Sequence, residues 1–453
     1  MNAIDNEKQY KRMTEEKIPA LVTSLALPTM LSMLITVIYS TADTYFVSQI
    51  NKSASAAVGV VYSIMAILQA IGFGLGMGAG SLISLNLGRK NEKQANIYAS
   101  SAFSAAIVTG GVVGIVCLIF IEPLLKLLGC TNTMLPYGLS YARYILAAAP
   151  ISCATFVLNN ALRAEGESLL AMIGLTAGGI INVILDPVLI FRLKMGCGGA
   201  ALATVISQTI SFIIFIFMFL RGKTIVKIKT EYISRSGGDY GKIISVGFPT
   251  ICRQGLGSVA AAALNIKAAV YGDAAVAAIT IANKVYVLVR NLIIGLGQGF
   301  QPVAGFNYGA GNKKRTWHAF LFATFLGTVI CVAFSIITIL FSEQIMWWFC
   351  KDTSVLNIGV NTIIYGGMVM PFMAFSTFVN QLYQCLGMKI RATFLASLRQ
   401  GIFFLPTVLI LPRFIGCTGV EASQPIADLM TFAVSVPFAV YFYKKYIKTE
   451  NLV

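Results

Sequence analysis

Long apolar blocks separated by short polar connections dominate this sequence. We identify twelve blocks, and most reach the roughly 20 residues that a helix needs to cross a bilayer. Leu, Ile, Ala and Gly dominate them without period-2 alternation, which favours helices over barrel strands. The pattern therefore predicts an all-α membrane protein with twelve transmembrane helices, at residues 18–48, 54–86, 97–122, 138–163, 168–191, 197–221, 241–271, 275–305, 316–342, 355–385, 393–412 and 418–443.

The low content of charged residues supports the same class. Only 11% of the 453 residues are charged, against about 25% in an ordinary soluble domain. The chain therefore has too few polar groups to cover a water-facing surface. The first 17 residues are polar, and the apolar run after them is longer than a signal-peptide core. We expect this first span to be retained.

The positions of the basic residues predict the orientation in the membrane. The net charge is +16, and most of the 34 Lys and Arg residues, Arg163 among them, fall in every second connection. The other connections hold only Lys52, Lys126, Arg143, Arg192, Lys194, Lys267, Lys351 and Arg413. By the positive-inside rule we expect both termini to lie in the cytoplasm. This distribution accounts for the net positive charge, so the charge does not indicate a nucleic-acid partner.

An internal repeat organises the chain. A shift of 221 residues places Gly, Pro and Asn landmarks of the first half on those of the second. The matches include Pro28 with Pro249, Gly74 with Gly295, Gly78 with Gly299, Asn86 with Asn307, Pro150 with Pro371, Asn159 with Asn380 and Gly166 with Gly387. We interpret the halves as two copies of six helices.

The repeat predicts the domain organisation. Six spans per copy give both copies the same orientation, so an axis along the membrane normal relates them. We assign residues 1–221 to an N-lobe, 222–240 to a cytoplasmic linker and 241–453 to a C-lobe. Transporters of this build bind substrate between the lobes and expose it to each side in turn. A duplicated scaffold without transport is the alternative.

Several common kinds of functional site are missing from the sequence. The Gly-Lys-Thr at 222–224 has Phe217 where a Walker A loop needs its first Gly, so we expect ion coupling and no bound nucleotide. The nine cysteines show no metal-ligand spacing, and no catalytic Ser/His/Asp set is evident. We expect no enzyme activity and no cofactor. Glycines four apart, such as Gly74 and Gly78, indicate close helix packing.

Acidic residues inside the spans are the strongest functional candidates, because such charges are costly in a membrane. Asp43 lies in the first predicted helix, and Asn182 and Asp186 share one face of the fifth. Pro187 frees the carbonyl of Val183 and predicts a kink there. These oxygen groups suit a proton or an alkali cation, and burial near a second carboxylate raises proton affinity. A buried Asp satisfied structurally at a kink is the alternative.

The second half carries basic residues instead. Asp43 aligns with Leu264, whereas Arg253, Lys284, Arg290 and Arg399 lie within predicted spans, and Asp428 is the acid of the last one. We expect each basic group to pair structurally, with Asp428 as the available partner. The alternative is that they face a wet cavity, where two or more of them would attract anionic substrate groups.

The motifs together resemble the multidrug and toxic compound extrusion (MATE) family, over essentially the whole chain. Ala-Asp-Thr-Tyr-Phe-Val at 42–47, Leu-Arg-Ala-Glu-Gly at 162–166 and Asn-x-x-x-Asp-Pro at 182–187 carry the resemblance. Gly-Leu-Gly-Gln-Gly-Phe-Gln-Pro at 295–302 and Arg-Gln-Gly-Ile-Phe-Phe-Leu-Pro at 399–406 are similar to its DinF-like and MepA-like bacterial members. The resemblance implies a V-shaped fold of two pseudo-symmetric six-helix lobes.

The resemblance also implies a function and a site. Family members export drugs in exchange for H+ or Na+, and the matching cation-site positions here are Asp43, Asn182, Asp186 and Thr204. Helices 7 and 10 lack the acids that NorM-like relatives use, which argues against a second Na+ site. We expect amphipathic, cationic drugs as substrates, contact with membrane lipids, and a monomer. A flippase for a lipid-linked or amphipathic anionic substrate, a membrane enzyme and a passive channel are the alternatives.

Overall fold

Helices make up nearly all of the computed structural model, which describes residues 3–222 and 224–448. The first lobe contains α2 (Ile18–Ser48), α3 (Lys52–Gly88), α4 (Glu92–Ile119), α5 (Ile121–Leu127), α6 (Leu135–Ala147), α7 (Ala149–Ala164), α8 (Ser168–Pro187), the π-helix η1 (Val188–Arg192) and α9 (Gly196–Leu220). A short 3-10 helix, η2 (Thr230–Tyr232), lies between the lobes in the chain. Residues 1–2, 223 and 449–453 of the predicted lobes and linker fall outside the described residues.

The second lobe repeats this order of elements. It contains α10 (Gly237–Ala269), α11 (Asp273–Gly309), α12 (Lys313–Leu340), α13 (Ser342–Phe349), α14 (Thr353–Cys385), α15 (Lys389–Ser397), η3 (Leu398–Phe404), α16 (Leu405–Ile410), α17 (Pro412–Ile415), α18 (Cys417–Phe442) and η4 (Tyr443–Lys448). Because α10 begins at Gly237, the helical part of this lobe starts inside the predicted linker.

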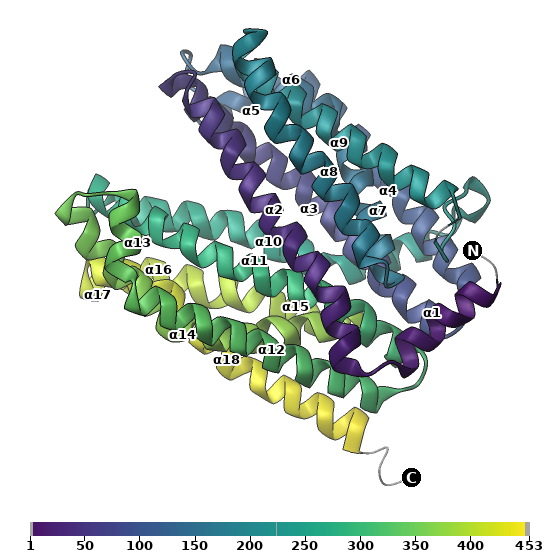
Figure 1. Cartoon of the computed structure of the whole chain (residues 1–453). Coiled ribbons are helices and arrows are strands. Elements are labelled where there is room, and N and C mark those ends of the chain that lie inside the picture. Colours follow the sequence, from purple (N-terminus) through teal and green to yellow (C-terminus); the bar gives the residue numbers. More distant parts are fainter. Residues whose placement is uncertain (1–2, 223, 449–453) are drawn as a thin grey trace.

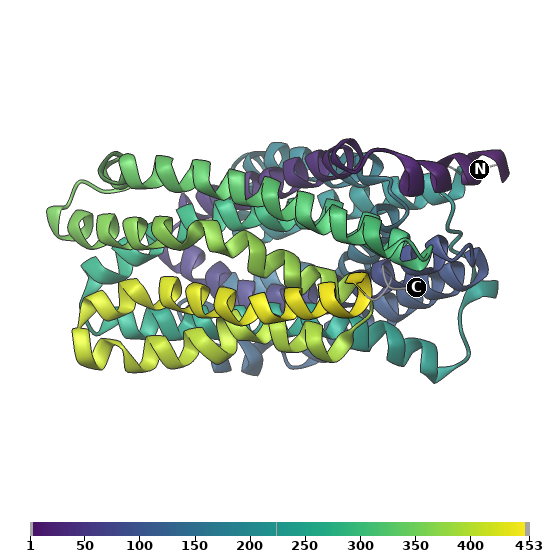
Figure 2. The same ribbon diagram turned by 90° about the horizontal axis from the view of Figure 1, so that it is seen from below.

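The two lobes form a V (Figure 1). They meet at one end of the molecule, where α1 (Ala3–Glu15) and the C-terminal end of α18 also lie, and they diverge toward the end that carries α5 and α13. Figure 2, seen from below, shows the helices running roughly along one common direction. We call the end where the lobes meet the closed end.

The number of spanning helices agrees with the predicted twelve. Ten helices or helix runs of the described residues are by themselves long and apolar enough to cross a membrane, and the bent pair α6 and α7 is an eleventh candidate. The remaining long helix is the 33-residue α10, which packs against α3. Polar residues such as Arg253 and Gln254 lower its hydropathy, and both line the cavity described below.

The internal repeat extends to helix ends and hydrogen bonds. α11 begins and ends 221 residues after α3, and α12 does the same after α4. Asn159 donates to the carbonyl of Ala171 at 3.0 Å, and Asn380 donates to the carbonyl of Ala392, again 221 residues on, at 2.8 Å. These asparagines therefore fix the same helix contact in both lobes.

Local structure departs from the predicted blocks in two places. The block at 138–163 is two helices, α6 and α7, with a bend of 52° between them. Pro150 stands in the first turn of α7, and because it has no amide hydrogen it cannot continue the hydrogen bonding of α6. The polar N-terminal segment, for which we predicted no element, forms α1.

Helix α1 bridges the lobes at the closed end. Gln9 donates to the backbone carbonyl of Glu165 in the first lobe at 2.9 Å. Asn307 of the second lobe donates to the carbonyl of Met13 at 2.9 Å. The Met13 side chain is fully buried. This short helix is therefore held by both lobes at once.

Glycines allow the lobe backbones to approach each other closely. A Cβ placed on Gly247 of α10 would lie 2.0 Å from the carbonyl oxygen of Gly74 in α3, and one on Gly78 would lie 2.2 Å from the oxygen of Ile243. The same holds for the related helix pair, where a Cβ placed on Gly299 of α11 would lie 2.4 Å from the Cα of Ala26 in α2. The predicted close-packing role of Gly74 and Gly78 thus applies between the lobes.

We expect Gly247→Ala to weaken the contact between the lobes, because the added methyl group has no room beside Gly74. Overpacking of this kind costs about 1–3 kcal/mol. The apparent unfolding temperature of the purified protein in detergent should fall. Gly255→Ala in the same helix is the control, since a Cβ there meets no atom within 4 Å. Equal unfolding temperatures for the two variants would contradict the contact.

Candidate functional site

The structure brings the four predicted cation-site residues together within the first lobe. Asn182 donates to the Asp186 carboxylate at 3.5 Å and to the Thr204 hydroxyl at 3.4 Å, which joins α8 to α9. Asp43 of α2 lies close enough to Asp186 for the two carboxylates to interact electrostatically. Both aspartates and Asn182 are buried, and Thr204 is half-buried.

Two tyrosines that the sequence did not point to complete this site. Tyr62 of α3 donates its hydroxyl to Asp43 at 3.2 Å. Tyr141 of α6 is fully buried and interacts electrostatically with both aspartates. No motif or spacing relates these tyrosines to the aspartates, because they lie in other helices and meet them only when the lobe folds.

The carboxylate site has free binding capacity. One oxygen of Asp43 and one of Asp186 are buried and have no hydrogen-bond partner among the described residues. An unpaired carboxylate is costly in a buried position unless a proton or a cation neutralises it. Carboxylate, amide and hydroxyl oxygens are hard ligands that suit an alkali cation. The site therefore fits H+ or Na+.

The predicted irregularity at Pro187 is present. Pro187 is the last residue of α8, and the π-helix η1 begins at Val188. Pro187 has no amide hydrogen to offer to the preceding turn. Single π-turns inside helices occur frequently at functional sites, and this one directly follows Asp186.

A cavity of about 580 Å³ lies between the lobes. The first lobe lines it with apolar and uncharged polar side chains, such as Met33, Tyr39 and Phe73, and contributes no charged residue to it within the described chain. Helix α2 supplies Thr36 and Tyr39 to this cavity and Asp43 to the carboxylate site one turn further on. One helix therefore connects the two sites.

The second lobe gives the cavity its charge, from Arg253 (α10), Arg290 (α11), Arg399 (η3) and Glu421 (α18). The expectation that each basic residue pairs with an acid is wrong for Arg253 and Arg290, because neither forms an ion pair or hydrogen bond with another residue of the described chain. Lys284 is exposed and lies outside this cavity.

Among the basic residues of the described chain, Arg399 alone forms an ion pair with Asp428. Its Nε lies 2.6 Å from Oδ1 of Asp428, and its Nη2 lies 3.4 Å from Oδ2. Gln424 donates to Oδ1 at 2.9 Å, and the Tyr286 hydroxyl donates to Oδ2. The carboxylate of Asp428 is fully engaged by these partners, which fix Arg399 in the cavity wall.

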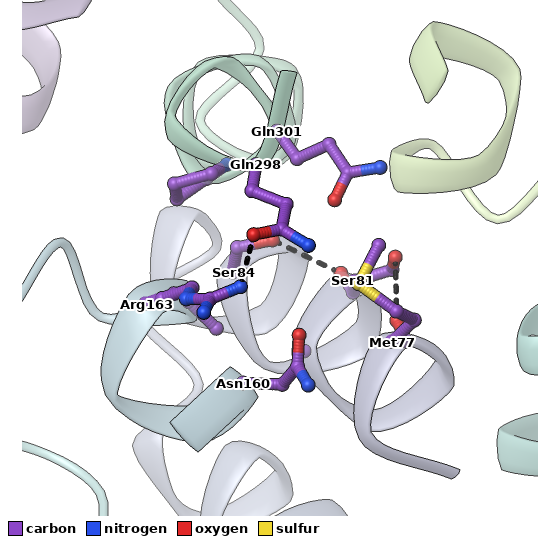
Figure 3. A pocket seen from close by; sticks show the side chains of 10 residues that line it. Met77, Ser81, Ser84, Asn160, Arg163, Gln298 and Gln301 are labelled. Carbon is purple, nitrogen blue, oxygen red and sulfur yellow. Dashed lines mark hydrogen bonds between the residues drawn. The ribbon is translucent and has the colours of Figure 1, made fainter. Parts of the chain in front are cut away.

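Arg163 lines a separate small pocket that shares Met77 and Gln298 with the cavity. The charge pattern of the sequence places this residue in a cytoplasmic connection, but it is only 3% exposed. Its guanidinium donates to the side-chain oxygen of Gln298 in the other lobe, as Figure 3 shows. Its Nε and Nη2 have no partner among the described residues. The one feature of the sequence that marks Arg163 is its place in the Leu-Arg-Ala-Glu-Gly motif at 162–166.

Comparisons with known proteins agree with this geometry. The MatE family model matches residues 28–188 and again 249–409. The multidrug export protein MepA of Staphylococcus haemolyticus is 27% identical over 446 residues, with 96% of each chain covered. A MATE crystal structure in complex with MaL6 has a TM-score of 0.92 at 25% identity, covering 97% of this chain and 99% of that one.

A transporter of the MOP superfamily from Pyrococcus furiosus, described as having a binding pocket of reverse polarity, has a TM-score of 0.91 at 24% identity. The similarity covers 97% of this chain and 98% of that one. These likenesses confirm the predicted all-α, two-lobe fold of twelve helices.

We expect Gln298→Leu to open the closed end more than Arg163→Met does. Gln298→Leu removes the hydrogen-bond acceptor of Arg163 and leaves its buried guanidinium charged. Arg163→Met removes that charge together with the hydrogen bond. Electron paramagnetic resonance distances between labelled noncanonical residues at positions 93 and 314, exposed in the two lobes, report the opening. The double variant should match Arg163→Met, and Arg143→Met on the exposed face of α6 is the control. Unchanged distances in Gln298→Leu would contradict this role.

Proposed function

Because the chain belongs to the multidrug and toxic compound extrusion (MATE) family, we propose that it is a secondary exporter of amphipathic drugs in exchange for H+ or Na+. It is a transporter and not an enzyme. In the proposed cycle the two lobes expose the central cavity alternately to the two sides of the membrane.

One observation carries this proposal: a substrate-sized cavity and a buried carboxylate pair are separate but share helix α2. Thr36 and Tyr39 line the cavity, and Asp43 interacts with Asp186. When Asp43 gains a proton or Na+, the balance of charge at the outer half of α2 changes. A shift of this helix would then alter the cavity wall, so that binding of the ion favours release of the substrate.

We propose that the closed end faces the cytoplasm. Helix α1 and the C-terminal end of α18 both lie at the closed end (Figure 1). The positive-inside rule places both termini and the basic connections of the sequence in the cytoplasm. The cavity then opens outward in this structure. We further propose the bacterial inner membrane as the location and a monomer as the working unit, since one chain supplies both lobes.

A flippase for a lipid-linked or amphipathic anionic substrate is the second candidate. The observation in its favour is the set of arginines in the cavity wall, because their positive charge would repel cationic drugs. A flippase of this kind would not need the carboxylate pair for coupling. The Asp43 and Asp186 variants below therefore distinguish the two functions.

We expect Asp186→Asn to abolish coupled export, because an amide can neither take up and release a proton at physiological pH nor supply the charge that holds Na+. Efflux of ethidium and of fluorescein from cells should fall at least about tenfold, with the protein still in the membrane. Asp43→Asn should be similarly severe, since the two carboxylates share one site.

Collapsing the proton and sodium gradients separately should stop wild-type efflux in one case only, and that gradient names the ion. Asp239→Asn, in the first turn of α10 and away from both sites, is the control. Undiminished gradient-driven efflux in Asp186→Asn would sink the proposed coupling role.

A further inference from the structure

Three arginines from separate elements converge on one wall of the interlobe cavity. Arg253, Arg290 and Arg399 all line it, and each lies close enough to the other two to repel them electrostatically. Charged side chains inside a membrane protein are costly and are usually kept for a purpose. Like charges held together raise that cost further, so a partner of opposite sign would stabilise this wall.

Residues of the chain neutralise only part of this charge. Asp428 is engaged by Arg399, Tyr286 and Gln424. Arg253 and Arg290 have no ion pair or hydrogen bond within residues 3–222 and 224–448, and the Nε of Arg290 is buried without a partner. Hence two guanidinium groups retain donors for a ligand.

Glu421 does not compensate them. It is the one acid among the residues that line the cavity, and its Oε2 is buried without a hydrogen-bond partner. Its side chain interacts with Cys417 in the first turn of the same helix, and it forms no ion pair within the described residues. Even if it is ionised, the lining keeps an excess of positive charge.

The opposite wall offers a different kind of contact. In the first lobe, the ring centroids of Phe73 and Phe156 lie 4.4 Å apart. Met77 and Leu175 line the cavity together with these rings. Such a surface holds an aromatic or aliphatic body through apolar contact. The cavity is therefore amphipathic across the lobe interface, with its apolar side in one lobe and its basic side in the other.

We propose that the cavity binds amphipathic substrates that carry an acidic group, a carboxylate, sulfonate or phosphate, at Arg253 and Arg290. The guanidinium group binds such oxyanions through charge-assisted, often bidentate hydrogen bonds. This inference rests on the proposed export function and narrows its substrates, and it runs against our expectation of cationic drugs. The acidic group can belong to a free small molecule or to a lipid headgroup.

A matched pair of dyes tests the proposal. Fluorescein and rhodamine 123 share a xanthene ring system but carry opposite charge at pH 8. We expect fluorescein to bind the wild-type protein in phosphatidylcholine nanodiscs at least about tenfold more tightly than rhodamine 123, measured by fluorescence anisotropy against empty nanodiscs. Tighter binding of rhodamine 123 would overturn the proposal without any variant.

Substitutions locate the site. Arg253→Gln and Arg290→Gln should each weaken fluorescein binding by about tenfold and leave rhodamine 123 unchanged or tighter. Arg290→Lys, which keeps the charge, should restore part of the affinity even where Arg290→Gln folds poorly. Lys284→Gln removes the same charge from the exposed part of α11 and is the control. Fluorescein affinity that is insensitive to both arginines but falls in Lys284→Gln would overturn the site.

The source of the acidic group is decided by adding phosphatidylglycerol to the nanodiscs. Competition with fluorescein in the wild type, but not in Arg253→Gln/Arg290→Gln, identifies a lipid headgroup, and no competition identifies a free amphipathic acid. Because these measurements are made at equilibrium without an ion gradient, their failure is distinct from a failure of coupled export in the Asp186→Asn experiment.

Discussion

Close backbone contact between the two lobes at the closed end determines how the other parts of the molecule are arranged. At Gly74 and Gly247, and again at Gly299 and Ala26, helices of opposite lobes touch without intervening side chains. Contacts of this kind replace the hydrophobic effect as the cause of helix association in lipid. Because the lobes pack against each other at one end only, they diverge at the other end and leave the cavity between them.

Polar contacts reinforce the same end. The Arg163 guanidinium bonds to Gln298 across the interface, and α1 holds both lobes through Gln9 and Met13. Buried polar groups left unpaired cost free energy, so these bonds can break only if others replace them. Opening of the closed end, which the proposed transport cycle requires, would therefore have to replace these contacts with hydrogen bonds to water.

The two lobes share one helical framework but differ in their electrostatics. Asp43 aligns with Leu264, so the carboxylate site of the first lobe has no counterpart in the second. The second lobe places Arg253, Arg290 and Arg399 at the cavity instead. The shared framework positions the proposed ion site in one lobe and the proposed substrate-binding arginines in the other, and α2 contributes residues to both the carboxylate site and the cavity lining. The two halves therefore share one helical scaffold and differ in a few buried charges.

The amino-acid sequence alone was enough to predict the membrane class, the twelve apolar segments, the 221-residue repeat and the grouping of Asn182, Asp186 and Pro187, because each depends on local composition or spacing. The folded structure was needed to show that Tyr62 and Tyr141 reach the aspartates, that Arg163 is buried between the lobes, and that Arg253 and Arg290 form no ion pair with any described residue. Those facts depend on contacts between helices far apart in the chain, and hydropathy and motif spacing carry no information on which faces of separate helices meet.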